Sequence, residues 1–309
     1  MRITVCLPQQ SLELRDDDGA VLARYLVSTS RNGAGEQRGS CRTPRGPHLI
    51  RAKIGGGAAT NTVFKGRRPS GEVWTPELAA RFPDRDWILT RILWLSGMRP
   101  GFNRLGEVDT MRRYVYLHGS PDTAPMGLPG SIGCVRMRNA DIIDLFDRVP
   151  ARTRVDIDDF RVRLGGWTDA SSEAKAVRET VFVREQNVPA DLELDELDAS
   201  SLHALAFDSA GKVLGTGRLL PDGHIGRMAV LPAARGQGTG RAILDALSEA
   251  ARERGHEVIR LNAQIQAVSF YQKYGFTSEG EAFLDAGIPH VAMLKRLNPG
   301  RVAPRALPA

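Results

Sequence analysis

The sequence predicts a two-domain protein, with a mostly-β domain followed by an α/β domain. A chain of 309 residues is long for a single hydrophobic core. Its first half consists of short runs of alternating apolar and polar residues, separated by turn-forming residues. After residue 158 such runs alternate with segments of helical periodicity. We therefore expect a first domain at residues 1–158, a linker at 159–166, a second domain with a mixed sheet at 167–297, and a disordered tail at 298–309.

Alternation predicts the strands of the first domain at residues 3–7, 11–14, 21–28, 48–53, 88–95, 113–117 and 153–157. The triplet Asp17-Asp18-Gly19 has the composition of a hairpin turn. Residues 55–87 are rich in glycine and proline, and we expect them to be irregular. Residues 139–146 predict a short helix with Ile142, Ile143 and Phe146 on one face.

In the second domain, helical spacing begins at residues 171–184. Further strands are expected at 203–207, 213–220, 225–231 and 258–261, and two more end near residue 297. A longer helix follows residue 240, because Ile243, Leu244, Leu247, Ala250 and Ala251 share one face and Gly255 is a typical stop. Residues 268–274 predict a short helix.

Charge and cysteine content narrow the class of protein. The formal charge is +6, but no recognition helix or zinc motif accompanies it, so we expect no specific nucleic-acid partner. The cysteines Cys6, Cys41 and Cys134 are odd in number and widely spaced, which predicts neither a disulfide framework nor a metal site. No apolar run could span a bilayer, and the N-terminus lacks the pattern of a secretory signal. We expect a cytoplasmic protein without a membrane span.

One cysteine and one histidine of the first domain have the setting that thiolate chemistry requires. Cys134 lies in the glycine-containing turn Ser131-Ile132-Gly133-Cys134, and His118 precedes it at the end of a predicted strand. An imidazole can remove the thiol proton, and the amides of Gly133 and Cys134 could bind the oxygen of a carbonyl. Two packing residues of a β-domain are the alternative interpretation.

The motifs Tyr116-Leu117-His118-Gly119-Ser120 and Ser131-Ile132-Gly133-Cys134-Val135-Arg136-Met137 resemble the YkuD-type L,D-transpeptidase catalytic domain. The resemblance covers roughly residues 1–157 and includes Thr43-Pro44-Arg45-Gly46. It implies that Cys134 is the nucleophile and His118 the base, with Gly133 and Ser131 on the oxyanion side and Arg136 orienting the substrate. It also implies a peptidoglycan-type peptide or muropeptide as partner, with an amine or water as acceptor. The family commonly has a second histidine where this chain has Ile132.

A glycine-rich turn marks the second domain. The segment Arg235, Gly236, Gln237, Gly238, Thr239, Gly240 and Arg241 lies between a predicted strand and a predicted helix. Backbone amides at a helix N-terminus suit a pyrophosphate, and glycines allow close approach. An ordinary strand-to-helix connection is the alternative.

This turn, the preceding strand with Met228, Ala229 and Val230, and the later Phe270-Tyr271 resemble the GNAT acetyltransferase superfamily over roughly residues 165–297. Segments such as Gly287-Ile288-Pro289-His290 resemble its ElaA-type branch. The resemblance implies acetyl-CoA as cofactor, with its pyrophosphate on residues 235–241 and its pantetheine on residues 228–230. It also implies Tyr271 as the acid that protonates the departing thiolate, and a small amine as acetyl acceptor.

An acetyl acceptor must lose a proton before it attacks, so a base is required. The acidic residues Glu193, Asp195 and Glu196 are candidates, with a solvated loop as the alternative. His290 and His203 are further candidates that also fit a structural role. The sequence thus predicts a bifunctional acyltransferase. The alternative is a ligand-binding or sensing protein in which one domain is inactive.

Overall fold

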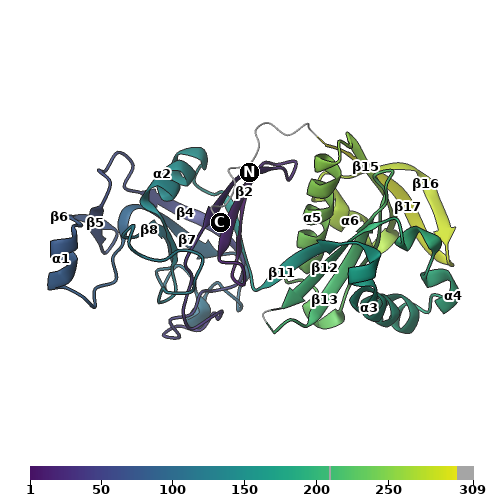
Figure 1. Ribbon diagram of the computed structural model, residues 1–309, viewed down its shortest axis with the longest axis horizontal. Helices are drawn as coiled ribbons and strands as arrows, with labels where there is room; N and C mark the ends of the chain where they lie inside the picture. The colour runs from purple at the N-terminus through teal and green to yellow at the C-terminus, as the bar shows by residue number, and fades with distance from the viewer. Residues whose placement is uncertain (209, 298–309) are drawn as a thin grey trace. The chain divides into compact units, whose positions relative to one another are not determined.

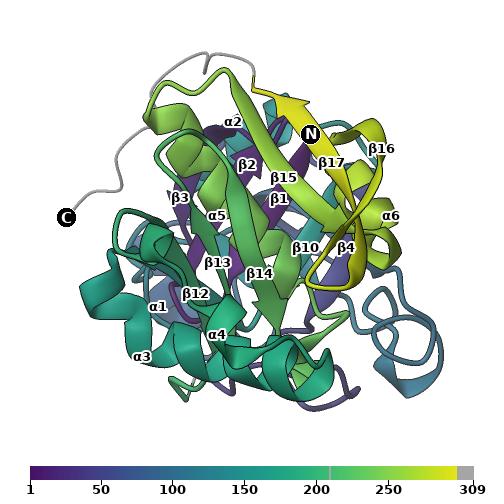
Figure 2. The same ribbon diagram turned by 90° about the vertical axis from the view of Figure 1, so that its right-hand side faces the viewer.

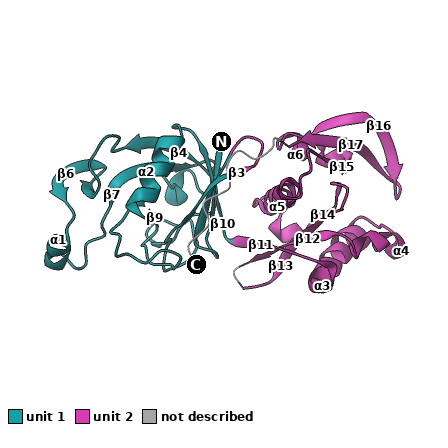
Figure 3. Cartoon of the chain, turned by 45° about the horizontal axis from the view of Figure 1, so that its top comes forward, with its two compact units in different colours: residues 1–15, 22–159, 304–309 teal, residues 16–21, 160–303 magenta. Residues whose placement is uncertain are grey.

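The computed structural model describes residues 1–208 and 210–297, which form two compact units (Figures 1 and 3). Residues 1–15 and 22–159 make up the first unit, and the second contains residues 16–21 and the described residues from 160 onward. A mostly-β unit is followed by an α/β unit, so the predicted fold class is confirmed. The predicted tail at 298–309 lies outside the described residues.

The first unit is built on one ten-stranded sheet in the order β3-β2-β1-β10-β4-β7-β5-β6, with β8 pairing to β7 and β9 to β8. Its strands are β1 Arg2–Cys6, β2 Ser11–Arg15, β3 Val21–Leu26, β4 Gly46–Ile54, β5 Thr62–Lys65, β6 Arg68–Val73, β7 Leu89–Gly97, β8 Tyr116–Gly119, β9 Val135–Met137 and β10 Arg154–Asp158. Its helices are α1 Pro76–Arg81, α2 Asn139–Arg148 and a 3-10 turn at Gly106–Val108.

The parallel pair β8 and β9 sets the position of the candidate chemistry. Leu117 lies opposite Val135, and His118 lies opposite Arg136. Cys134 therefore directly precedes β9, beside the strand that carries His118. The motif residues that are distant in the sequence are neighbours in the sheet.

The expectation that residues 55–87 are irregular was wrong. They contain the hairpin β5–β6 and the helix α1. Gly66 and Arg67 join the two strands with φ values of 56° and 68°, as a two-residue turn with both central residues left-handed requires. The glycine content therefore marked a turn within this segment. Thr75 caps α1 by accepting a hydrogen bond from the Leu78 amide.

Helix α2 packs on the sheet of the first unit. The expected helix is present and extends to Arg148. Ile142, Leu145 and Phe146 are its buried apolar residues, whereas Ile143 is only partly buried. The inward face is thus rotated slightly from the predicted one, and it joins the main apolar core of the unit.

The second unit contains two separate sheets, in the orders β11-β12-β13-β14 and β15-β17-β16. Its strands are β11 Phe160–Gly165, β12 Leu202–Asp208, β13 Val213–Leu219, β14 Ile225–Val230, β15 Val258–Gln264, β16 Thr277–Asp285 and β17 Ile288–Arg296. Its helices are α3 Trp167–Arg178, a π-helix at Glu179–Glu185, α4 Ala190–Glu193, α5 Thr239–Glu253 and α6 Val268–Gln272, with 3-10 turns at Glu196–Asp198, Pro232–Ala234 and Ile265–Ala267.

The interval expected as a linker, residues 159–166, contains β11, which pairs with β12 along its whole length. Phe160 is buried and Val162 packs against the second unit's core, while Arg161 and Arg163 are exposed. This is an ordinary strand alternation. The arginines between its apolar residues made this segment resemble a polar linker in composition.

Helices α3 and α5 cover opposite faces of the first of these sheets (Figure 2). Along β12, Ala204 and Ala206 pack in the cluster of α5, whereas Leu205 and Phe207 pack in the cluster of α3. Successive strand residues point to opposite faces, so both faces of β12 are buried. In the described parts of the chain, no helix is both long and apolar enough to cross a membrane.

The strands β14 and β15 diverge. A single parallel bridge, His224 to Arg260, joins the two strands, and each then pairs only within its own sheet. Strand β14 also carries a register irregularity, and Arg227 there has a φ of 49°. Gly226, Arg227 and Met228 of β14 line a cavity beside this divergence.

Candidate active sites

The first site is centred on Cys134 and His118. The His118 side chain is fully buried, and its Nδ1 lies 2.8 Å from the Gly119 carbonyl oxygen. Because a carbonyl only accepts, Nδ1 carries the proton and Nε2 keeps its lone pair. That Nε2 is buried without a hydrogen-bond partner among the described residues. A buried unpaired acceptor is costly, which is typical of a functional group.

The Cys134 thiol is not bonded to this imidazole. Its Sγ donates to the carbonyl oxygen of Tyr114 at 3.6 Å. Burial raises the pKa of Cys134 to about 12, against a lowering contribution from the Tyr116 backbone amide. Burial also lowers the pKa of His118. At neutral pH the pair is therefore a neutral thiol and a neutral imidazole.

Hydrogen bonds of the Ser131 side chain hold the turn before Cys134. The Ser131 hydroxyl donates to the Cys134 carbonyl at 2.6 Å and accepts from the Gly133 amide at 3.2 Å. Gly133 has a φ of 131°, and its carbonyl accepts from Thr43 at 3.1 Å. Ser131 thus shapes the turn, and the Gly133 amide expected in the oxyanion hole is occupied by the Ser131 hydroxyl in this structure.

Arg136 forms an ion pair that sequence analysis missed. Its Nη2 lies 2.5 Å from Asp86, and Nη1 donates to the Gly130 carbonyl. The Asp86 charge acts to raise the pKa values of both His118 and Cys134, in each case less strongly than burial acts. Asp86 lies 50 residues before Arg136, so no local motif indicated it.

A pocket of about 300 Å³ opens beside Cys134. It is lined by the arginines Arg38, Arg112 and Arg113, by Gly39, Cys41, Tyr114 and Val115, and by the turn residues Ile132, Gly133 and Cys134. No carboxylate is among these lining residues. Arg113 donates to the carbonyls of Gly35, Glu36 and Arg42 and so holds the loop that carries Cys41. The pocket suits an anionic group.

The second site begins at the glycine-rich turn. Gly238 is the N-cap of α5 with a φ of 98°, and no side chain caps the helix. The first-turn amides of a helix have no intrahelical acceptor, so they suit an anion here. Arg235 is held by Glu185 at 2.7 and 2.6 Å and by the Val230 carbonyl.

The other polar side chains of this turn are bonded to neighbouring parts of the protein. Gln237 donates to the Ala233 carbonyl and Thr239 to the Ala234 carbonyl. Arg241 is buried and pairs with Asp245 at 3.4 Å. Backbone atoms of residues 235–241, rather than side chains, are therefore what the turn can present. With glycine at 236, 238 and 240, this surface fits the pyrophosphate of an acyl-CoA.

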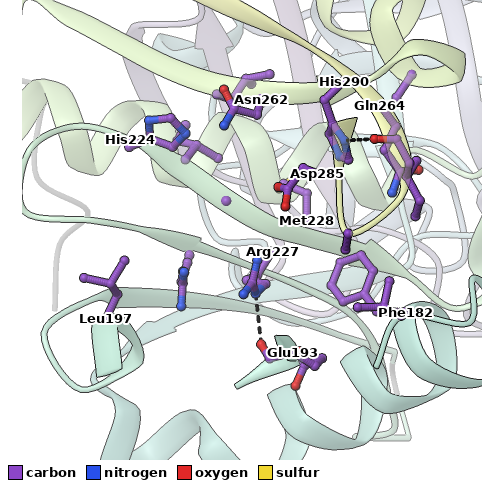
Figure 4. A pocket seen from close by; sticks show the side chains of 18 of the residues that line it. Phe182, Glu193, Leu197, His224, Arg227, Met228, Asn262, Gln264, Asp285 and His290 are labelled. Carbon is purple, nitrogen blue, oxygen red and sulfur yellow. Dashed lines mark hydrogen bonds between the residues drawn. The ribbon is translucent and has the colours of Figure 1, made fainter. Parts of the chain in front are cut away.

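A cavity of about 560 Å³ lies between the diverging strands (Figure 4). Met228 from β14, Gln264 from β15, Tyr271 from α6 and His290 from β17 contribute to its wall. Burial raises the pKa of Tyr271 to about 12, so its hydroxyl keeps its proton at neutral pH. That state is the one a proton donor needs.

The acidic residues expected as bases have other partners. Glu193 is buried and bonded to Arg178, which is also buried. Asp195 accepts from Arg218 and Arg227 at 2.5 to 2.9 Å. Burial alone would raise the pKa of Asp195, but the two arginines outweigh it and hold the pKa below its usual range. Glu196 is exposed and does not line the cavity.

His203 also has partners within the protein. It is buried, its Nε2 bonds to the Asp198 carbonyl at 3.0 Å, and its ring packs on Trp167. Asp198 in turn accepts from Arg178 and Arg218. The acidic loop is thus anchored by arginines from α3 and β13, a partnership that sequence spacing did not reveal.

Comparisons with known proteins match both units of the chain. The family model for the L,D-transpeptidase catalytic domain matches residues 1–157, and that for the acetyltransferase (GNAT) domain matches residues 168–297. YjcF of Bacillus subtilis, described as an uncharacterized N-acetyltransferase, is 48% identical over 128 residues, which are 40% of this chain and 90% of that protein.

Solved structures match the second unit. An acyl-CoA N-acyltransferase from Pseudomonas aeruginosa is 30% identical, with a TM-score of 0.40, over 44% of this chain and 99% of that one. ElaA of Escherichia coli is 25% identical, with a TM-score of 0.41, over 44% and 99%. From the two family matches, this chain is an acyltransferase that belongs to the L,D-transpeptidase catalytic domain family in residues 1–157 and to the GNAT acetyltransferase family in residues 168–297.

Proposed function

We propose that this chain is a bifunctional acyltransferase. Its first unit acts through Cys134 on peptidoglycan-type peptides, as an L,D-transpeptidase or L,D-carboxypeptidase. Its second unit acetylates a small amine with acetyl-CoA. The observation that supports the first activity is the unpaired Nε2 of His118 on the strand beside Cys134. The observation that supports the second is the divergence of β14 from β15 over a cavity containing Tyr271.

In the first unit, the neutral imidazole acts as a general base at the moment of attack. Nε2 of His118 takes the thiol proton while Sγ of Cys134 bonds to the carbonyl carbon of the scissile peptide bond. The carbon–nitrogen bond then breaks, and the imidazolium returns the proton to the departing amine, which is D-alanine in this family. A second amine or a water molecule resolves the thioester and regenerates the thiol.

The pocket beside Cys134 supports a substrate with a carboxylate. Arg38 and Arg112 are among its lining residues, and guanidinium groups bind carboxylates in a bidentate manner. Peptide stems carry such groups. Arg136, paired with Asp86 and absent from the wall of this pocket, instead orders the surroundings of His118.

In the second unit, acetyl-CoA supplies an activated acetyl group as a thioester. The amides at the start of α5 and the glycine turn would hold its pyrophosphate, and the β14 backbone at Met228, Ala229 and Val230 would hold the pantetheine. The protonated Tyr271 hydroxyl would supply a proton to the departing sulfur. We also propose a cytoplasmic location, in line with the free state of Cys6, Cys41 and Cys134.

Separate measurements on the full chain test the two activities. Acetyl-CoA at about 100 times its Kd should stabilise the second unit by about 2.7 kcal/mol. Mass spectrometry of tetrapeptide muropeptides should show D-alanine release and an acyl adduct on Cys134, both lost in Cys134→Ala. If D-alanine release persists in Cys134→Ala, the cysteine mechanism is wrong. If saturating acetyl-CoA leaves the unfolding temperature unchanged, the acetyl-CoA assignment is wrong.

A further inference from the structure

His290 is a buried histidine in the wall of the second unit's cavity, and the mechanism above does not use it. We propose that His290 is the general base of the acetyl transfer, which removes the proton from the acceptor ammonium. The proposal rests on the acetyltransferase activity proposed above. It assigns the base to the β16–β17 hairpin, and it leaves the acidic loop at Glu193 with an architectural role.

Hydrogen bonding fixes which ring nitrogen of His290 is basic. Nδ1 lies 2.8 Å from the carbonyl oxygen of Ile288 (Figure 4). A carbonyl only accepts, so Nδ1 carries the proton and Nε2 keeps the lone pair. The Phe283 ring stacks on the imidazole with centroids 6.1 Å apart and planes 26° apart. The ring is therefore held in one orientation and one tautomer, as a base requires.

The position of His290 also suits the reaction. It lies opposite Gln264 in the β15–β17 ladder, at the end of β15 that leads to α6 and Tyr271. The proposed acid and base thus lie near the same end of the cavity wall. His224 lines the cavity too, but it precedes Met228 by four residues of strand, about 13 Å along the chain. That places His224 away from the expected thioester.

The other charged and titratable side chains of the wall come from several elements. They are Asp285 at the end of β16, Tyr271 of α6, Arg218 of β13, Arg227 of β14, Glu193 of α4, and Asp222 and His224 before β14. Arg218 and Arg227 both donate to Asp195, and Arg227 also donates to the Glu193 carbonyl. The Glu193 carboxylate accepts from Arg178. Asp285 and Asp222 are exposed, and such carboxylates are well placed to attract a cationic amine.

The step balances without an added reagent. Nε2 of His290 accepts one proton from the acceptor ammonium, and the freed nitrogen lone pair bonds to the acetyl carbonyl carbon. The carbon–sulfur bond breaks, and Tyr271 protonates the sulfur. The imidazolium then releases its proton to solvent, and the new amide gives up its second proton, which restores Tyr271.

The test compares His290→Gln with His256→Gln, a histidine outside the cavity wall, and with His224→Gln. Two acceptors serve as probes in the full chain with acetyl-CoA. They are propylamine, which is cationic at neutral pH, and methoxyamine, which is uncharged. We expect His290→Gln to lower kcat/KM for propylamine by about 10²- to 10⁴-fold, with acetyl-CoA affinity and methoxyamine turnover nearly unchanged. The acid limb of the wild-type pH profile should disappear in this variant only.

Equal losses with both amines would show that His290 only shapes the cavity, and the proposal would fail. Loss of the acid limb in His224→Gln instead would assign the base to that residue. A readout that needs no turnover is the ¹⁵N spectrum of the labelled chain with bound CoA. A proton on Nε2 of His290 would overturn the proposal, and a proton on Nδ1 would support it. Failure of acetyl-CoA to protect the fold would reject the acetyltransferase itself, independently of His290.

Discussion

His118 lies on β8 and Cys134 directly precedes the neighbouring strand β9, yet each is hydrogen-bonded to a backbone carbonyl and not to the other. The imidazole bonds to the carbonyl of Gly119 and the thiol to the carbonyl of Tyr114. Both groups are neutral, because burial raises the pKa of Cys134 to about 12 and lowers the pKa of His118. In the proposed mechanism, the Cys134 sulfur must therefore leave the Tyr114 carbonyl before it can attack a substrate.

The first prediction concerns thiol reactivity. Only a thiolate is alkylated rapidly, and burial opposes its formation. We expect Cys134 to react with iodoacetamide much more slowly than the exposed Cys41 at neutral pH, and to speed up as pH rises toward 12. Mass spectrometry of the two cysteine peptides measures both rates in one sample. Faster labelling of Cys134 than of Cys41 at pH 7 would indicate a preformed thiolate and contradict this assignment.

The parts of the first site that sequence analysis found are those encoded by short local motifs. His118 and Cys134 each lie in a segment of a few residues whose pattern is legible without the fold. Asp86, Arg38 and Arg112 reach the same region from distant loops, and nothing in their own segments distinguishes them from surface charges. Chain folding, rather than sequence spacing, makes them neighbours.

The second site shows a different limit. The sequence of an acidic loop does not show whether its carboxylates contact a substrate or pair with buried arginines. Glu193 pairs with Arg178 of α3. Arg178 is fully buried, and the sequence of this helix did not indicate a buried charge. The glycine turn was recognisable because a left-handed N-cap such as Gly238 requires glycine. Backbone constraints were thus read more reliably than the partners of side chains.

The second prediction concerns the Ser131 hydroxyl, which bonds within the turn to the Gly133 amide and the Cys134 carbonyl. Ser131→Ala removes both bonds and leaves buried groups unsatisfied, so we expect a loss of about 1–3 kcal/mol. Urea denaturation measures this loss, with the exposed Ser70→Ala as control. An unfolding free energy equal to that of the control would show that the hydroxyl does not hold the turn.

The third prediction concerns acid stability of the first unit. Burial lowers the pKa of His48 from 6.5 to about 4, and its ring bonds to Gly46 and Thr110. The unfolded chain binds this proton at higher pH than the folded chain, so stability is complete above pH 6.5 and falls between 6.5 and about 4. The pKa difference corresponds to about 3 kcal/mol, and the buried His118 acts in the same direction.

Hydrogen exchange of the β4 peptide across this pH range measures the His48 effect. The wild type should lose protection as pH falls through the window, beyond the intrinsic change in exchange rate. His48→Gln should start less stable and change less with pH, because it has no ionisable group. Parallel pH dependence in the two proteins would assign the loss to other groups.

The fourth prediction separates two neighbouring acids of the loop that the sequence presented as one cluster. Glu193 is buried against Arg178, whereas Glu196 is exposed. Removing one partner of a buried ion pair leaves the other charge uncompensated, so Glu193→Gln should destabilise the second unit by about 3–5 kcal/mol. Glu196→Gln should change stability by no more than about 0.5 kcal/mol.

Acetyl transfer measured at temperatures below the onset of unfolding should keep its pH profile in both variants, because His290 and not this loop is the proposed base. If Glu193→Gln shifts the pH profile of acetyl transfer without changing stability, then a residue of this loop, and not His290, is the general base.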